Sequence, residues 1–141
     1  MALSREERAR FLAEPHTGAL SVDAGPGRAP LTVPIWYQYA PGGELWILTG
    51  AASRKAELIR AAGRFTLMAD TTQPSVRYVS VEGPVVSWER TTREQLTEMS
   101  ARYLPADKVE GYVEWSWKEH GEQTTVRMRP ERWLSADMGT V

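Results

Sequence analysis

The residues best suited to chemistry form the run Thr49-Gly50-Ala51-Ala52-Ser53-Arg54-Lys55. Small residues end a predicted strand here, and a hydroxyl followed by two cations opens a predicted helix. The first backbone N–H groups of a helix have no partner within it and carry partial positive charge, so they attract anions. Cations at this end oppose the helix dipole unless an anion lies beside them. The run therefore predicts either a phosphate site or an ordinary helix cap followed by solvated charges.

A second candidate feature is the run Val33-Pro34-Ile35-Trp36-Tyr37. Its large side chains and its proline predict a stiff, flat, apolar strand. A planar ring can lie against such a strand while backbone groups bind the polar edge of the ring. The competing interpretation is a strand of the core that leaves Trp36 at the surface, and the residues alone leave both interpretations open.

Other types of active site have little support in the sequence. The absence of cysteine excludes thiol nucleophiles, disulfides and cysteine-based metal centres. His16 and His120 have no metal-ligand companion at helical spacing, so no metal site or triad is indicated. Arg127, Arg129 and Arg132 are interpreted as a solvated strand edge rather than a second anion site.

Composition and charge exclude several classes of protein. The 141 residues are 42% hydrophobic, which favours one domain, residues 1–141, with a substantial core. Seventeen Lys and Arg against 18 Asp and Glu give a net charge of −1, which argues against a nucleic-acid partner. No segment approaches the roughly 18 apolar residues of a membrane helix. The charged N-terminal segment is not followed by the apolar stretch of a signal peptide, so a cytoplasmic location without membrane contact is expected.

The elements that must position these residues follow from periodicity and turn residues. Four helices are predicted, over residues 5–13, 54–62, 92–103 and 105–120. Strands are predicted over residues 17–22, 31–39, 44–49, 64–70, 76–88, 123–129 and 133–137. Sequential strands joined by tight turns favour a mainly β, antiparallel fold. A closed barrel with peripheral helices fits this order better than a parallel sheet.

Local details sharpen this prediction. Ser4 with Glu7, and Thr91 with Glu94, have the spacing of a capping box. Residues 31–39 alternate between apolar and polar types, and Pro34 requires that the strand be interrupted or lie at an edge. Gly83-Pro84 indicates a bulge or bend in a long strand. The apolar and aromatic residues of 109–120 span an arc of roughly 200°, which predicts contacts on two sides of the last helix.

The runs VPIWYQY, GGELWILTG, SRKAELIRAAGRFTLMAD and RYVSVEGPV, in this order, resemble the pyridoxamine 5′-phosphate oxidase-like split barrels. The resemblance covers roughly residues 11–86. It is closest to the small actinobacterial proteins that bind the flavin FMN or the deazaflavin F420. It implies a six-stranded antiparallel split β-barrel that forms a homodimer with two cofactor sites at the subunit interface.

The resemblance also implies which residues bind the cofactor. Its phosphate is expected at Ser53, Arg54 and Lys55. The ring is expected along two strands, at Val33, Pro34, Ile35 and Trp36 and at Leu48, Thr49 and Gly50. From the facing subunit, Tyr78 and Trp133 are the candidates. The chain ends RPERWLSADMGTV and lacks the Arg-x-His substrate motif of the true oxidases, so vitamin B6 oxidation is not expected.

The leading functional hypothesis is an oxidoreductase that uses F420 or FMN, with F420 ahead, to transfer a hydride to or from a small organic substrate. The cofactor performs this chemistry, so no catalytic side chain is required, which suits a chain poor in His and Cys. One alternative is a non-catalytic split barrel that binds FMN, haem or another planar ligand. A further alternative is a structural dimer without a cofactor.

Overall fold

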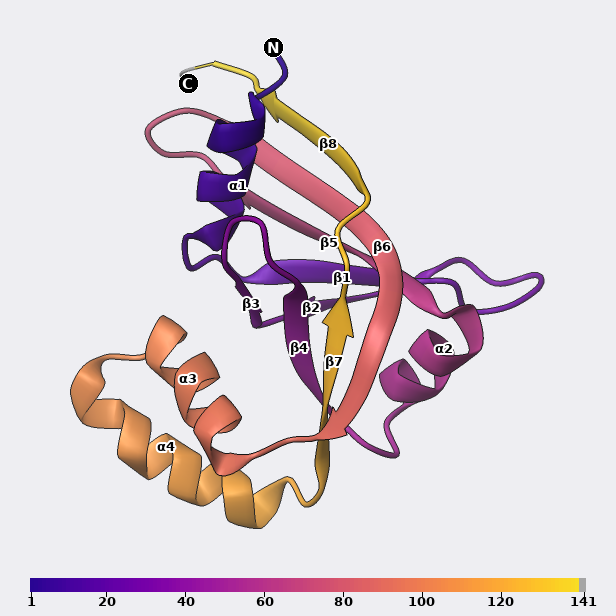
Figure 1. Ribbon diagram of the computed structural model, residues 1–141, viewed down its shortest axis with the longest axis vertical. Coiled ribbons are helices and arrows are strands. Elements are labelled where there is room, and N and C mark those ends of the chain that lie inside the picture. The colour runs from indigo at the N-terminus through magenta and orange to yellow at the C-terminus, as the bar shows by residue number, and fades with distance from the viewer. Residues whose placement is uncertain (140–141) are drawn as a thin grey trace.

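The computed structural model describes residues 1–139, which form one sheet system with four helices around it (Figure 1). The helices are α1 (Arg5–Ala13), α2 (Arg54–Ala62), α3 (Arg93–Tyr103) and α4 (Ala106–Glu119). The strands are β1 (Gly18–Val22), β2 (Leu31–Ile35), β3 (Tyr37–Tyr39), β4 (Leu45–Gly50), β5 (Arg64–Thr71), β6 (Arg77–Arg90), β7 (Gln123–Met128) and β8 (Arg132–Asp137).

The strands follow the antiparallel order β2-β1-β5-β6-β7-β4-β3. The first and last strands of this path, β2 and β3, are separated in the chain only by Trp36, so the chain itself joins the two ends. Counted as one interrupted strand, β2 and β3 bring the path to the six strands expected of a split barrel. The additional strand β8 pairs with β6 outside this path. The predicted antiparallel split barrel is therefore confirmed.

The strand predicted over residues 31–39 breaks at Trp36, and its first half lies at an end of the path. There β2 pairs only with β1, which fits the prediction that Pro34 needs an edge or an interruption. The alternation is also confirmed, because Ile35 is buried while Thr32 and Pro34 are exposed. The buried side chains of β1, β4, β5, β6 and β7 fill the interior together with Tyr37 and Leu12.

The long strand β6 is crossed closely by the chain at Gly83. Strands β7 and β8 both pair with β6, one along each half, and the segment between them passes over Gly83. Arg129 N donates to Pro84 O at 3.0 Å, and Glu131 N donates to Glu82 O at 2.9 Å. A Cβ atom on Gly83 would lie 1.8 Å from the carbonyl oxygen of Arg129. The predicted irregularity at Gly83-Pro84 is thus a crossing point, and the register of the ladder shifts just beyond it.

The N-caps of α1 and α3 show how far residue spacing alone predicts where a helix begins. The capping box of Ser4 and Glu7 is present at α1, as predicted. The box predicted for Thr91 and Glu94 is wrong by one position, because α3 is capped by Thr92 and Gln95. Thr91 is instead buried at the end of the sheet, where its hydroxyl bonds to that of Thr125 at 3.0 Å. Strand pairing therefore decides which of two adjacent threonines caps the helix.

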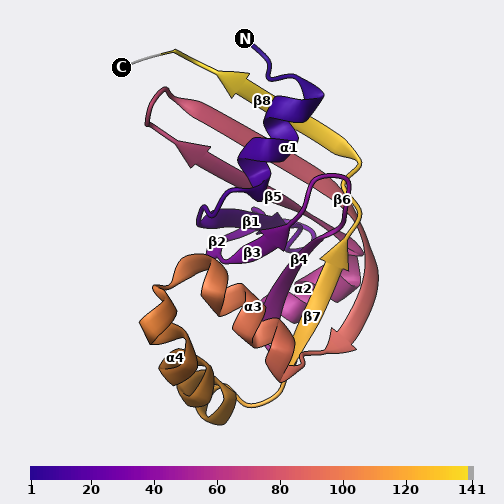
Figure 2. The ribbon, with the colours of Figure 1, turned by 60° about the vertical axis from the view of Figure 1, so that its left-hand side comes forward.

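Helices α3 and α4 form a hairpin between β6 and β7, on the side of the barrel away from β8 (Figures 1 and 2). Pro105 is the N-cap of α4. The prediction that it lies in the first turn is wrong by one position. Val113 and Ser116 of α4 are buried, whereas Trp115 and Trp117 are 52% and 44% exposed. Within this chain, the wide apolar arc of α4 is therefore covered on one side only.

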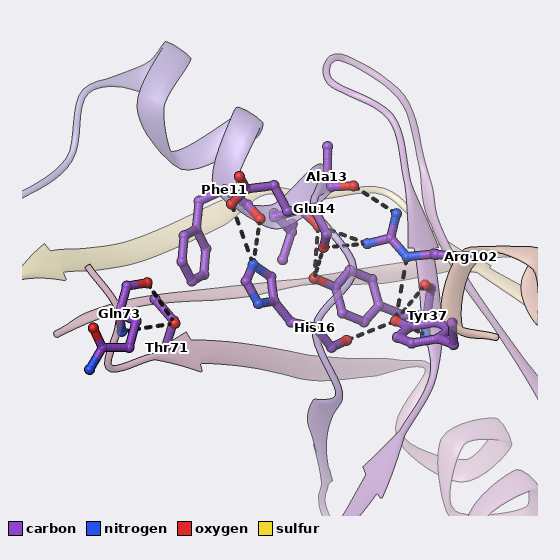
Figure 3. Close-up of polar contacts among 10 residues, drawn as sticks. Phe11, Ala13, Glu14, His16, Tyr37, Thr71, Gln73 and Arg102 are labelled. Atoms are coloured by element: carbon purple, nitrogen blue, oxygen red, sulfur yellow. Dashed lines mark hydrogen bonds and ion pairs between the residues drawn. The ribbon is translucent and has the colours of Figure 1, made fainter. Parts of the chain in front are cut away.

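The C-terminal end of α1 is held by Arg102 of α3 (Figure 3). The last carbonyl groups of a helix lack partners within it, and a guanidinium can supply several donors at once. The Arg102 guanidinium donates to the carbonyl oxygens of Ala13 and Glu14 at 2.7 Å each and to that of Leu12 at 3.2 Å. The hydroxyl of Tyr37 donates to the same Leu12 oxygen at 2.7 Å. The α3–α4 hairpin is thereby tied to α1 and to the start of β3.

Replacing Arg102 with alanine is expected to lower the free energy of unfolding by about 2 kcal/mol, since it removes charge-assisted hydrogen bonds to partly buried carbonyls. Urea unfolding followed by circular dichroism measures this difference. Arg28→Ala, in the exposed loop between β1 and β2, is the matched control and is expected to change stability by less than about 0.5 kcal/mol. Equal stabilities of the two variants would show that the Arg102 contacts are not structural.

Candidate functional site

A cavity of about 480 Å³ lies between the barrel and the α3–α4 hairpin. Its barrel side is formed by residues in or next to β1, β2, β4, α2 and β7: Thr17, Pro34, Ile35, Trp36, Leu48, Lys55 and Gln123. Its helical side is formed by residues of α3 and α4 and by the residue that follows α4: Leu96, Met99, Ser100, Tyr112, Ser116 and His120. Seven of these thirteen residues are apolar or aromatic and six are polar or charged, so the cavity offers both kinds of group that a ligand site uses.

Trp36 occupies the break between β2 and β3, and its orientation is set by the α3–α4 hairpin. Its ring stacks on that of Tyr103, with centroids 4.8 Å apart and planes 10° apart. The ring of Tyr112 lies tilted at 5.6 Å. The Tyr103 hydroxyl accepts a bond from Tyr37 N at 3.1 Å and donates to His16 O at 2.8 Å. The aromatic end of the cavity is therefore a fixed arrangement.

Lys55 brings a positive charge to the cavity from the first turn of α2. Among residues 1–139, no acidic side chain forms an ion pair with it. Partial burial lowers the pKa of Lys55 from its ordinary value, because desolvation disfavours the charged ammonium. A half-buried cation without a counter-ion, beside a helix N-terminus, favours an anionic ligand.

The other residues of the predicted phosphate run are engaged elsewhere. The Ser53 hydroxyl caps α2 by accepting from Ala56 N at 3.1 Å, and it also bonds to the Thr49 hydroxyl at 2.9 Å. Arg54 is exposed, with its guanidinium 3.9 Å from the carboxylate of Glu57. The helix-cap interpretation holds for Ser53, and the phosphate site stays a prediction that depends mainly on Lys55.

The helical side presents Tyr112, Ser116 and His120, spaced four residues apart on α4 and its C-cap. Ser116 is 3% exposed, and its side-chain oxygen has no hydrogen-bond partner within residues 1–139. The nearby Ser100 hydroxyl, by contrast, donates to Leu96 O at 2.7 Å. Every fully buried side-chain oxygen in this part of the chain has a partner. The Ser116 oxygen is therefore not fully enclosed, and Ser116 lines both this cavity and an adjoining one of about 150 Å³ beside Trp117 and Glu122.

Five of the predicted cofactor residues line this one cavity: Pro34, Ile35, Trp36, Leu48 and Lys55. Val33 lines a shallower depression of about 280 Å³ that shares Thr17 and Pro34 with it. Thr49 and Gly50 end β4, Ser53 caps α2 and Arg54 begins it, and all four lie outside the lining. Residues far apart in the sequence are thus brought together at the end of β2, the end of β4 and the start of α2.

The two residues predicted to act from the facing subunit, Tyr78 and Trp133, lie away from the cavity of their own chain. Tyr78 pairs across β6 with Ala136 of β8. The ring of Trp133 packs against that of Tyr39 at 6.0 Å, with the guanidinium of Arg8 4.6 Å above it. A role for either residue toward a second subunit stays a prediction.

None of the predicted site residues belongs to the helical wall. The periodic arc of 109–120 contains Tyr112, Ser116 and His120, so the signal was present, but periodicity does not say what a helix face contacts. Gln123 was also missed; it pairs with Gly50 where β7 runs beside β4, next to the predicted phosphate run. Strand pairing over more than 70 residues brings it there, and no local pattern reveals it.

Other polar groups have structural partners. The His16 ring stacks on Phe11 at 4.3 Å, and its Nε2 lies 3.1 Å from Phe11 O. Arg127 and Arg129 pair with Glu89 and Glu131, as expected of a solvated edge. In residues 1–139, no group of three His, Asp or Glu side chains is arranged to hold a metal ion. None of the helices in that range is long and apolar enough to span a membrane.

Comparisons with known proteins agree with this architecture. A crystal structure of a conserved hypothetical protein from Mycobacterium tuberculosis superposes with a TM-score of 0.71 at 27% identity, over 97% of this chain and 86% of that one. A structure titled F420 reductase gives 0.68 at 20% identity, over 89% and 94%. A FAD-binding protein from Mesorhizobium loti gives 0.61 at 20% identity, over 96% and 93%. A search of curated proteins finds no match.

The family model described as pyridoxamine 5′-phosphate oxidase matches residues 4–136. This match spans nearly the whole chain, from the cap of α1 into β8, and includes both walls of the cavity. The six-strand path, the cavity at the end of β2 and this match agree, and the chain belongs to the pyridoxamine 5′-phosphate oxidase family.

Proposed function

We propose that the protein is an oxidoreductase that binds a flavin or deazaflavin, F420 or FMN, in the cavity between the barrel and the α3–α4 hairpin. The observation that carries this proposal is the convergence of Pro34, Ile35, Trp36, Leu48 and Lys55 on one cavity. The F420 reductase and the FAD-binding protein that share the fold support the same class of ligand.

The residues present fit such a cofactor on two counts. Lys55 supplies a cation without a counter-ion, as a cofactor phosphate requires. The apolar end, with Trp36 held flat by Tyr103, provides a surface for a planar ring. Both F420 and FMN carry a phosphate and a flat ring, so these groups serve either one.

The residues that line the cavity have separate roles in the proposed reaction. When bound, a reduced flavin or deazaflavin supplies a hydride to the substrate. Lys55 holds the anionic end, residues 34–36 set the plane of the ring, and the α3–α4 hairpin excludes water from one side. The titratable groups of the lining are Lys55, Tyr112 and His120, so the proton that accompanies the hydride comes from one of the latter two or from solvent.

We further propose a homodimer in which Tyr78 and Trp133 approach the cofactor of the facing subunit, in keeping with the family. A small organic molecule is the proposed substrate. Sedimentation of the purified protein gives the oligomeric state, and Tyr78→Ala and Trp133→Ala variants show whether either residue affects cofactor binding.

The test is a fluorescence titration of the purified protein with F420 and with FMN, followed by turnover of the reduced cofactor with quinones, enones and tetrapyrroles. Saturable binding of one cofactor and its oxidation by a member of the panel are expected. Binding without oxidation by any acceptor would favour the carrier alternative. If neither cofactor binds, the proposal is wrong.

A further inference from the structure

We infer that the α3–α4 hairpin supplies, from the same chain, the second wall of the cofactor-ring site, with the Ser116 hydroxyl bonding to the polar edge of the ring. This inference rests on the proposed function and extends it to residues of α4. The ligand class is a planar heterocycle with carbonyl and N–H groups along one edge and an anionic group at its end.

The first argument is the state of Ser116. A hydroxyl that opens onto a cavity and has no protein partner bonds there to ordered water or to a ligand. Ser116 is 3% exposed and has no hydrogen-bond partner in residues 1–139, while Ser100, on the same helical side of the cavity, donates to Leu96 O. A ligand in this cavity can satisfy Ser116 because a hydroxyl both donates and accepts.

The second argument is the arrangement of polar and aromatic groups along α4. Tyr112 lies against Trp36 at one end, and His120 is the C-cap at the other. Eight residues of helix span about 12 Å, so this row runs the length of a fused ring system. His120 is followed closely by Gln123, which pairs with Gly50 beside the start of α2. The row therefore leads from the aromatic end of the cavity toward the end that carries Lys55.

The third argument is that the wall is held in place. Tyr103, at the end of α3, stacks on Trp36 and bonds to Tyr37 N, while Arg102 binds the end of α1. The interior face of the hairpin, formed by Leu96, Met99 and Val113, is buried. A rigid second wall lets the site bind a ring without reorganisation.

The test compares the affinities of F420 and FMN for the wild type and three variants by fluorescence titration. Ser116→Ala removes the hydroxyl and is expected to raise the Kd about three- to tenfold. Ser116→Leu adds bulk to the cavity and is expected to raise the Kd more than tenfold. Thr97→Ala, which removes an exposed hydroxyl on α3, is the matched control and should bind as the wild type does. Melting temperatures verify that each variant is folded.

The outcomes separate the two proposals. If the wild type binds a cofactor and both folded Ser116 variants bind it equally well, the inference about α4 is wrong and the proposed function stands. If the wild type binds neither F420 nor FMN, both are wrong. A raised Kd for both Ser116 variants with an unchanged Thr97→Ala supports the second wall.

Discussion

Lys55→Met is expected to weaken the binding of F420 or FMN by about 10- to 100-fold, the largest effect we expect of any single change at the cavity. Methionine keeps most of the apolar stem that lines the cavity and removes only the charge. The expected loss is that of a charge-assisted hydrogen bond to phosphate in a half-buried site, where water screens it poorly. Fluorescence titration at neutral pH measures the Kd.

The lysines and arginines of the chain provide matched controls. Lys108→Met, at an exposed position of α4, is expected to leave the Kd within twofold of the wild type. Arg54→Met is expected to have a small effect, because Arg54 is exposed beside Glu57 and outside the lining. Similar affinities for the Lys55 and Lys108 variants would show that the anion does not bind at the start of α2.

The pH dependence of binding follows from the lowered pKa of Lys55. The protonated amine binds an anion, so affinity is expected to be greatest below this pKa and to fall as the pH rises through it. Because the pKa of free Lys55 lies below that of an ordinary lysine, the decline is expected to begin at a lower pH than a solvated lysine would give. Titrations between about pH 7 and pH 10 test this, and Lys55→Met should abolish the slope.

Gly83→Ala is expected to lower the free energy of unfolding by about 3 kcal/mol or more, and the melting temperature by roughly 10 °C. The added Cβ would lie 1.8 Å from the carbonyl oxygen of Arg129, where β6 is crossed by the segment between β7 and β8. That contact is with backbone, which no side-chain rotation can relieve. The hydrogen bonds at Pro84 and Glu82 would have to lengthen to admit the methyl group.

Gly111→Ala is the matched control for this prediction. Gly111 lies inside α4 with open space where its Cβ would be, so alanine is expected to raise the free energy of unfolding by about 0.5–1 kcal/mol. Thermal and urea unfolding of both variants measure the difference. If Gly83→Ala is as stable as the wild type, the crossing is looser than its geometry indicates.

Much of the fold could be predicted because it depends on local patterns. The cap of α1 at Ser4, the left-handed Gly63 that ends α2 and the alternation over residues 31–39 are properties of neighbouring residues. The N-cap of α3 lies one residue after the predicted one, because a contact distant in the sequence decides it. Thr91 and Thr92 are equivalent locally, and only the contact of Thr91 with Thr125 of β7 distinguishes them.

The candidate site could be predicted from the barrel side but not from the helical side. The run that carries Lys55 and the strand that carries Trp36 have recognisable residue types, so each was identified separately. That Lys55 turns toward the cavity while Arg54 turns away depends on the packing of α2 against the barrel. Ser116 lies in the aromatic arc of α4, but neither that arc nor the sequence around Gln123 says what it contacts, and only the path of the chain from β6 to β7 brings both residues to the site.

The two ends of the segment between β6 and β7 lie side by side. The α3–α4 hairpin leaves β6 at Arg90 and rejoins the sheet at Gln123, and these ends meet through a pairing of Arg90 with Thr124 and a bond from Thr91 N to Gln123 O at 2.9 Å. The free energy of closing such a segment depends only weakly on its length. The roughly 30 intervening residues are joined to the sheet at one base, and Arg102 and Tyr103 add contacts with α1 and β3. A change in the length of this segment that keeps those contacts is expected to alter the helical wall of the cavity and to leave the barrel ladder unchanged.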